Sequence, residues 1–156
     1  MRAITLAFLF LLPGVVDAQQ ASYTYINQKP PYKNLNPPML TALNLPRINA
    51  KFQVRVPAAY STPTGKGEAF LATGVANPNV VLPTLRGFLF TTADHLMLSP
   101  RSKSWVTVTF SIPNSPVLVG GRFYQQVLAV RYDAPYGPCS GGCPFLSRGG
   151  VGVIGR

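Results

Sequence analysis

The chain has 156 residues, with 14 Lys or Arg against 4 Asp or Glu and a single His, so its formal net charge is +10. This length suffices for one domain whose hydrophobic core needs neither a structural metal nor several disulfides. The basic residues are dispersed without a long run of like charges, which argues against nucleic acid as a partner and favours a solvated surface.

The first 18 residues have the composition of a secretory signal peptide. One positive charge at Arg2 precedes an apolar run at 3–12, a Pro-Gly pair, and small residues before a cleavage point after Ala18. The run is too short to span a bilayer, which requires roughly 20 apolar residues. We therefore expect residues 1–18 to be removed, the protein to be secreted or placed in the cell envelope, and no membrane span to remain.

Residues 19–45 are rich in Pro, Asn and Tyr and form a segment of their own. Pro-Pro pairs at 30–31 and 37–38 forbid a regular helix, because proline removes a backbone donor and restricts the residue before it. Only residues 22–26 have the composition of a short strand. We expect residues 19–45 to be an extended arm packed loosely on the domain, which comprises residues 46–156.

Alternating apolar and polar residues, with turn residues between the repeats, run through the rest of the chain. Residues 47–56 alternate as a half-buried strand does, and residues 68–75 form the next strand. Residues 86–99 supply one or two more strands, interrupted near Ala93. The expected core residues of this segment are Phe88, Phe90, Leu96 and Leu98.

The clearest alternation lies between residues 104 and 132, in a central pair of strands joined by a structured loop. On residues 105–112 one face carries the expected core residues Val106, Val108, Phe110 and Ile112. Pro116 suits the first position of a single helical turn, which a Gly-Gly pair then ends. Residues 123–132 are partly apolar on both faces, which is typical of a central strand.

These patterns together predict an all-β protein, since strands recur with turns between them and no substantial helix is indicated. We expect a single antiparallel β-sandwich, Ig-like or jelly-roll-like, with about seven to eight strands.

The loop and the strand that follows it carry a pattern similar to one in the C-terminal β-sandwich module of many secreted bacterial proteins of unknown function. The matching residues are Ile112, Pro113, Asn114, Pro116, Leu118, Gly120, Phe123, Tyr124 and Gln126. That module also ends in a serine-led turn and a strand closing in Ile-Gly, matched here by Ser147, Val151, Val153, Ile154 and Gly155. Its first strand resembles Leu43, Leu45, Pro46, Arg47 and Ile48.

The resemblance covers residues 43–156 and implies a location outside the cytoplasm, often beside larger domains, with no established activity. The chain departs from the pattern at Asn49, where Gly is expected, and at Arg148, where Asn is usual. Both departures concern the geometry of turns and leave the implied fold unchanged.

Cys139 and Cys143 are predicted to form a disulfide, since an even cysteine count in an exported chain favours pairing. The Gly-Gly pair between them supplies the φ angles that such a tight loop needs. By the chain-entropy formula this bridge contributes only about 2 kcal/mol. A metal site is the alternative, but only His95 could join the two thiolates, and a closed structural site needs four ligands. We expect no metal and no other cofactor.

The titratable residues form no local catalytic pattern. Asp94 and His95 are adjacent and point to opposite faces if they lie on a strand. Glu68 and Asp133 have no partner nearby in the sequence, whereas glycosidases need two carboxyls at a controlled separation. No Gly-rich loop opens a helix, so nucleotide binding has no support. We expect no enzymatic activity; a hydrolase would require His95 and two carboxylates to converge.

Aromatic residues and their polar neighbours are the candidate ligand contacts, because exposed rings stack on sugars and amide or guanidinium groups bond hydroxyls. They are Trp105, Tyr124, Gln125, Gln126, Arg131, Tyr132 and Tyr136. The alternative, which the sequence favours, places Trp105 and Tyr124 in the core or at the sheet rim.

Two hypotheses about function follow. The leading one is a secreted, non-catalytic β-sandwich that acts as a structural or cell-surface interaction module, with an unidentified protein or an envelope polysaccharide as its partner. The second is a carbohydrate- or polyanion-binding module that uses the candidate contacts and the basic surface.

Overall fold

A computed structural model of the chain describes residues 19–29, 40–57, 61–62, 65–85, 87–99, 105–131 and 143–156. Within these ranges the chain forms antiparallel β-sheets and two short 3-10 turns, and no α-helix. The expected all-β class is therefore confirmed. No described segment forms a helix long and apolar enough to cross a membrane. The predicted signal peptide, residues 1–18, lies outside the described residues.

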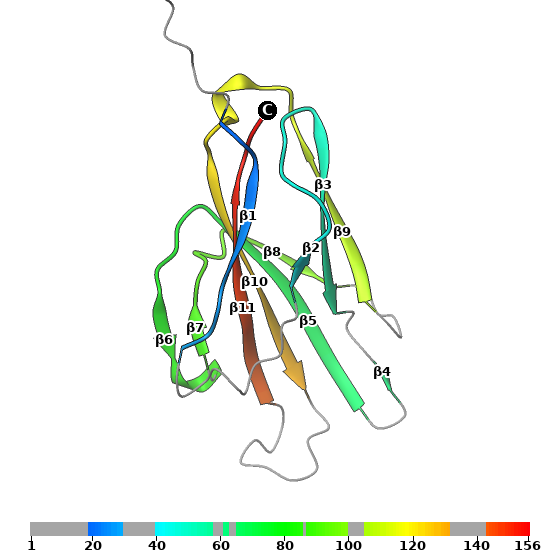
Figure 1. The fold of residues 1–156 in the computed structure, drawn as a ribbon. Coiled ribbons are helices and arrows are strands. Elements are labelled where there is room, and N and C mark those ends of the chain that lie inside the picture. Colours follow the sequence, from blue (N-terminus) through cyan, green and yellow to red (C-terminus); the bar gives the residue numbers. More distant parts are fainter. Residues whose placement is uncertain are drawn as a thin grey trace, which may run out of the picture.

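Two sheets pack face to face as a sandwich (Figure 1). The larger sheet has the strand order β1-β11-β10-β5, and β4 and β8 both pair with β5. Its strands are β1 (Ser22–Ile26), β4 (Ser61–Thr62), β5 (Gly65–Gly74), β8 (His95–Leu98), β10 (Arg122–Arg131) and β11 (Cys143–Val153). The smaller sheet has the order β2-β3-β9 and consists of β2 (Thr41–Ala42), β3 (Ala50–Pro57) and β9 (Trp105–Ile112).

The remaining elements are a hairpin and the two 3-10 turns. They are β6 (Val80–Leu82), η1 (Pro83–Leu85), β7 (Gly87–Leu89) and η2 (Pro116–Leu118). The two-residue strands and this hairpin raise the number of strands above the expected seven to eight.

The core between the sheets follows from the alternation on β3. Phe52, Val54 and Val56 are buried, whereas Lys51 and Arg55 are exposed. Their buried partners across the sandwich are Ala69, Leu71, Val127 and Ala129. Each fully buried large apolar side chain contributes roughly 1.5–3 kcal/mol to stability. A slip of one residue in register would expose these side chains to solvent, and most of this stabilisation would be lost.

The inner row of β9 is less buried than its pattern predicts. Its alternation is as expected, but only Val108 is buried, and Val106, Phe110 and Ile112 are half-buried. The reason is that β9 pairs with β3 alone among the described strands and forms the border of the smaller sheet (Figure 1). No described strand covers its other side.

The loop after β9 carries the chain from the smaller sheet to the larger one. β9 pairs with β3, whereas β10 pairs with β5 and β11, so the two strands expected as a central pair are not neighbours. The predicted helical turn is present as η2. Beyond it Gly120 has a φ of +85°, and its N–H donates to the carbonyl of Ile154 over 2.8 Å. The expected central position of β10 is confirmed, because described strands pair with both of its edges.

Residues 19–45 contribute to both sheets, where a loosely packed arm was expected. β1 pairs with β11 over its full length, and β2 pairs with β3. Leu40 is fully buried in the core. Its carbonyl accepts two hydrogen bonds from Arg148, whose guanidinium lies 3.7 Å from the centre of the Tyr25 ring. The sandwich therefore begins before residue 46, and residues 19–29 and 40–45 belong to it.

Asn49 and Arg148, the two departures from the resembled pattern, both occupy defined positions in the structure. Asn49 has a φ of +56°, so it takes the left-handed conformation that a Gly would supply and that Asn tolerates better than most residues. Arg148 lies with Ser147 in a β-bulge opposite Val127, since the register shifts there. The Ser147 hydroxyl accepts the Val127 N–H over 2.9 Å. The last strand therefore contains a β-bulge.

The segment 86–99 forms two strands, β7 and β8, separated near Ala93, whose φ is +56°. Phe90 is fully buried, as predicted, and Phe88 is half-buried. The predicted core positions Leu96 and Leu98 are wrong, since both side chains are 56% exposed. Among the described strands β8 pairs with β5 alone, and the side of β8 that packs against the core carries Met97 instead.

Candidate binding site between the sheets

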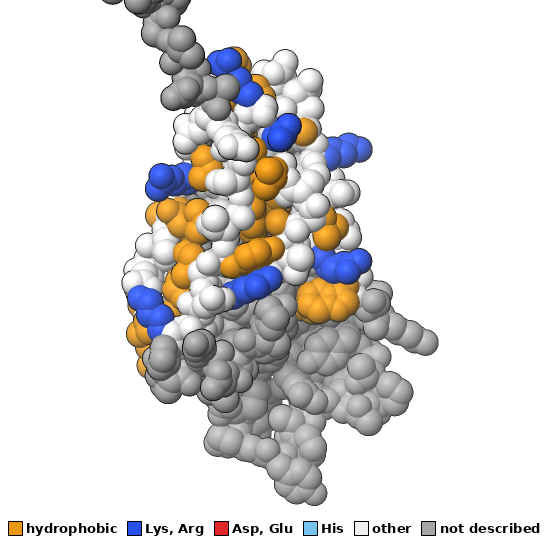
Figure 2. Space-filling view, in the orientation of Figure 1, with side chains coloured by type: hydrophobic (Ala, Val, Ile, Leu, Met, Phe, Trp, Pro, Cys, Tyr) orange, Lys and Arg blue, Asp and Glu red, His pale blue; other side chains and the backbone are white. Residues whose placement is uncertain are grey.

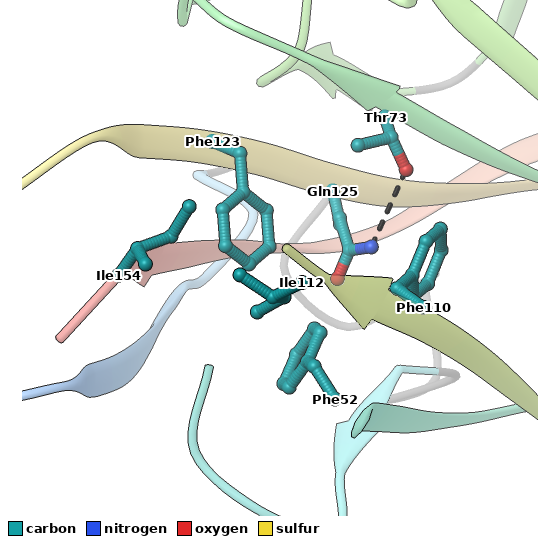
Figure 3. Close-up of a pocket in the computed structure, with 7 residues that line it drawn as sticks. All are labelled: Phe52, Thr73, Phe110, Ile112, Phe123, Gln125 and Ile154. Carbon is teal, nitrogen blue, oxygen red and sulfur yellow. Dashed lines mark hydrogen bonds between the residues drawn. The ribbon is translucent and has the colours of Figure 1, made fainter. Parts of the chain in front are cut away.

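An apolar pocket of about 130 Å³ opens between the two sheets (Figure 3). Its lining comes from facing rows of side chains on four strands and from the residue after β11: Phe52, Thr73, Phe110, Ile112, Phe123, Gln125 and Ile154. The lining is almost wholly apolar. Since an apolar cavity of about 150 Å³ accepts benzene, this inter-sheet pocket has room for one hydrophobic group of that size.

Aromatic packing holds one wall of the inter-sheet pocket in place. The rings of Phe52 and Phe110 are stacked with centroids 6.2 Å apart, and Phe123 meets Phe52 edge-on at 5.5 Å. Tyr23 lies behind them, 5.4 Å from Phe52. Such pairs contribute about 0.5–1.5 kcal/mol each beyond the area that they bury. The wall is therefore formed before any ligand arrives.

The polar groups at the pocket are paired with one another; Gln125 is buried, and Tyr23 and Thr73 are half-buried. Gln125 is 1% exposed; its Oε1 accepts the Tyr23 hydroxyl over 3.0 Å, and its Nε2 donates to the Thr73 hydroxyl over 3.3 Å (Figure 3). Burial raises the pKa of Tyr23 far above its ordinary value, so Tyr23 stays a neutral donor. The inter-sheet pocket thus presents no charge and suits an apolar ligand group.

The backbone of β9 has one edge that no described residue pairs. On β3, the groups of Lys51 and Gln53 point toward β2: Leu43 N donates to Gln53 O over 2.9 Å, and Asn44 bonds Lys51 O and Gln53 N over 2.7 Å each. Successive residues of a strand alternate in this direction, so Phe52 and its even-numbered neighbours bond to β9.

The register then identifies the unpaired groups of β9. The partners of Phe52, Val54 and Val56 are Phe110, Val108 and Val106. The backbone N–H and C=O groups between them therefore point away from β3. These groups form the free edge of β9 and belong to Trp105, Thr107, Thr109 and Ser111.

The outer side of the smaller sheet is polar and basic. The side chains of the free-edge residues are exposed on it, and Trp105 is 46% exposed. In the neighbouring row, Lys51 stands opposite Ser111 and Arg55 opposite Thr107. Figure 2 shows Lys and Arg side chains spread singly over the visible face, with no acidic side chain of the described residues among them.

The structure does not bring together the predicted ligand contacts whose side chains it describes. Trp105 lies on the outer face of the smaller sheet. Tyr124 is half-buried on the outer face of the larger sheet, because it alternates with Gln125, which faces the other sheet at the pocket. The two rings thus lie on opposite outer surfaces of the sandwich, and Gln125 lies between the sheets.

Gln126 has a structural place in the larger sheet. Its side chain is fully buried; Oε1 accepts Phe90 N over 2.9 Å, and Nε2 donates to Phe88 O over 2.8 Å and to Ser147 O over 2.9 Å. Gln28 donates to the same two carbonyls over 3.1 and 2.7 Å. These two amides fasten the β7 segment across β10 and β11, which leaves Gln126 no free group for a ligand.

The remaining predicted site residues lie at or beyond the limits of the described chain. Arg131 ends β10, and its side chain lies outside the description together with Tyr132, Tyr136 and Cys139. Cys143 begins β11, again without a described side chain. The Cys139–Cys143 disulfide therefore stays a prediction.

The described titratable residues are not gathered into one site. Asp94 accepts hydrogen bonds from the Thr92 hydroxyl and the Val75 amide, which hold the pKa of its carboxyl below the ordinary value. His95 is exposed on β8 opposite Thr73, whereas Glu68 lies five residues further along β5, about 17 Å away at 3.4 Å per residue. Among the described residues, no three His, Cys, Asp or Glu side chains could share a metal ion.

Of the seven pocket-lining residues, Gln125 was among the predicted ligand contacts, and the other six were missed as a site by sequence reasoning. Phe110 and Ile112 were expected in the core, and the incomplete burial of β9 was not signalled by its pattern. Comparisons of the chain with protein-family models, with curated proteins and with solved structures found no match.

Proposed function

We propose that this protein is an exported, non-catalytic β-sandwich that acts as an interaction module at the cell surface or in the cell envelope. The observation that supports this function best is the smaller sheet, where the free edge of β9 adjoins an apolar, uncharged inter-sheet pocket. Surfaces of this kind bind macromolecules through backbone bonding and apolar anchors, and they supply no group for acid–base chemistry.

Two further observations agree with this proposal. The sequence begins with the pattern of a secretory signal peptide and resembles a module of secreted bacterial proteins. The described candidates for general acid–base catalysis, Glu68, Asp94 and His95, do not form a common site.

The test is site-specific photo-crosslinking of the full chain in the cells that produce it. A photoreactive residue placed at Thr107, on the free-edge side of β9, is expected to give a discrete crosslinked protein. The matched control places the same residue at Thr24, which is exposed on β1 in the other sheet. An absence of crosslinked products from both positions would contradict an interaction module.

Carbohydrate or polyanion binding is the second candidate, because Trp105 is exposed and the described part of the smaller sheet's outer face carries Lys51 and Arg55. An exposed ring stacks on sugars, and the basic side chains attract anionic groups. Retention on heparin that falls with salt, and that Lys51→Gln and Arg55→Gln reduce further, would favour this candidate. A glycan array with no bound sugar and no heparin retention would dispose of it.

A further inference from the structure

We propose that β9 is a docking edge for one extended strand of a partner protein, which joins the smaller sheet and places an apolar side chain in the inter-sheet pocket. The proposal rests on the proposed function and names the surface and the class of partner. The free edge of β9 presents backbone donors and acceptors that no described residue pairs. An added strand satisfies such groups with main-chain hydrogen bonds.

The edge lacks the features that usually keep sheet edges from pairing. The eight residues of β9 include no proline, no Lys or other charged residue, and no bulge in their pairing with β3. In natural proteins such features normally prevent an edge strand from pairing with another chain, or other segments cover the edge. The edge strands of the larger sheet are shorter than β9: β1 has five residues, β4 has two and β8 has four. The length and composition of β9 therefore suit it to pairing with another strand.

The inter-sheet pocket indicates what the inner row of the added strand carries. Side chains directly opposite one another on neighbouring strands lie about 4.5–5.5 Å apart. Inward residues of the added strand would thus stand beside Phe110 and Ile112, which are half-buried and line the pocket. A Phe or Ile at one of these positions would fill the inter-sheet pocket and bury the half-exposed side chains of Phe110 and Ile112.

The charge of the smaller sheet indicates what the outer row carries. The outward residues of the added strand would lie beside Thr107, Thr109 and Ser111, and about 10 Å from the row of Lys51 and Arg55, two strand spacings away. Long basic side chains reach across such a distance, and no acidic residue lies on β3 or β9. The partner strand therefore alternates apolar residues with Thr, Asp or Glu.

The experiment is amide hydrogen exchange, measured residue by residue, on the mature chain with and without a synthetic peptide. The peptide has nine residues, with Ile, Phe and Val at alternate positions and Thr, Asp and Glu between them. In the protein alone, we expect the N–H groups of Val106, Val108 and Phe110 to be protected and those of Thr107 and Thr109 to exchange fast. The peptide should protect the second set and change the fluorescence of Trp105, the only Trp in the chain.

Two pairs of variants separate the edge from the pocket. Thr109→Pro removes a free-edge N–H but no backbone bond to β3, and proline is tolerated at such edge positions. Thr109→Val is its control, because both variants lose the long side-chain bond from Gln53. Thr73→Leu fills the pocket from β5, and Thr73→Val is its control. We expect Thr109→Pro and Thr73→Leu each to weaken peptide binding by at least about tenfold. A tenfold loss of affinity corresponds to the burial of roughly two methylene groups. The two valine variants keep the free N–H and the open pocket, so they should lose less binding than Thr109→Pro and Thr73→Leu. Thr24→Val, on β1 of the other sheet, should bind as the wild type does.

The outcomes that overturn the proposal are specific. They are no protection of Thr107 and Thr109 by about 1 mM peptide, or binding that Thr109→Pro leaves unchanged. Concentration-dependent protection of these amides in the protein alone would assign the edge to a second copy of the chain instead. If crosslinked partners persist in cells while the peptide has no effect, the interaction module stands and only the docking edge on β9 fails.

Discussion

Replacing Gln126 with Met keeps the length of a fully buried side chain and removes its three hydrogen bonds. The carbonyls of Phe88 and Ser147 retain their bonds from Gln28, whereas the N–H of Phe90 loses the acceptor shown for it. An unsatisfied buried donor costs about 1–3 kcal/mol, and each lost bond about 0.5–1.5 kcal/mol. We therefore expect Gln126→Met to lower the free energy of unfolding by about 2–5 kcal/mol.

The assay is equilibrium unfolding in urea, followed by the fluorescence of Trp105. The control is Gln53→Met, because Gln53 is half-exposed on β3 and its side chain makes one long bond, of 3.3 Å, to Thr109. That control should change the free energy of unfolding by less than about 0.5 kcal/mol. A decrease in the free energy of unfolding of less than about 1 kcal/mol for Gln126→Met, at an unchanged urea dependence, would refute the role of the buried Gln126 amide in holding the β7 segment on the larger sheet.

Three further predictions concern other parts of the sandwich. Gly152→Ala should lower the thermal midpoint, since its Cβ would overlap the Phe123 ring and overpacking costs about 1–3 kcal/mol; an unchanged midpoint would show that the ring moves freely. Hydrogen bonds lower the pKa of Asp94, so its carboxylate stabilises the fold above its ordinary pKa and this contribution is lost as pH falls through the lowered value. Asp94→Asn should reduce the fall of the unfolding midpoint at acid pH. A variant with the same pH dependence as the wild type would contradict this. Mass spectrometry of exported protein should find Cys139 and Cys143 bridged, and two free thiols would count against the disulfide.

The sequence was most informative where a strand has one buried and one exposed face. On β3 the buried side chains of Phe52, Val54 and Val56 follow the alternation residue by residue. The same reasoning failed at Leu96 and Leu98, which are apolar but exposed. In the described part of the chain β8 pairs only with β5, and alternation gives no sign of how many neighbours a strand has.

The candidate site was less accessible to sequence reasoning than the fold. Trp105 and Tyr124 are separated by the thickness of the sandwich because β9 and β10 belong to different sheets, a fact that their nearness in sequence hides. The inter-sheet pocket combines β3, β5, β9 and β10, so it depends on strand order. Strand order is set by long-range pairing, for which local periodicity carries no information.

The position of β11 bears on how the chain folds. β11 lies between β1 and β10, so the larger sheet cannot be completed until residues 143–153 have been synthesised. Contacts between the ends of a chain raise its contact order, and closing so long a loop slows folding. Until then one edge of β10 lacks its partner, and the chain is exposed to mispairing. Completion of the larger sheet therefore depends on the arrival of β11, which joins two strands that lie far from each other in the sequence.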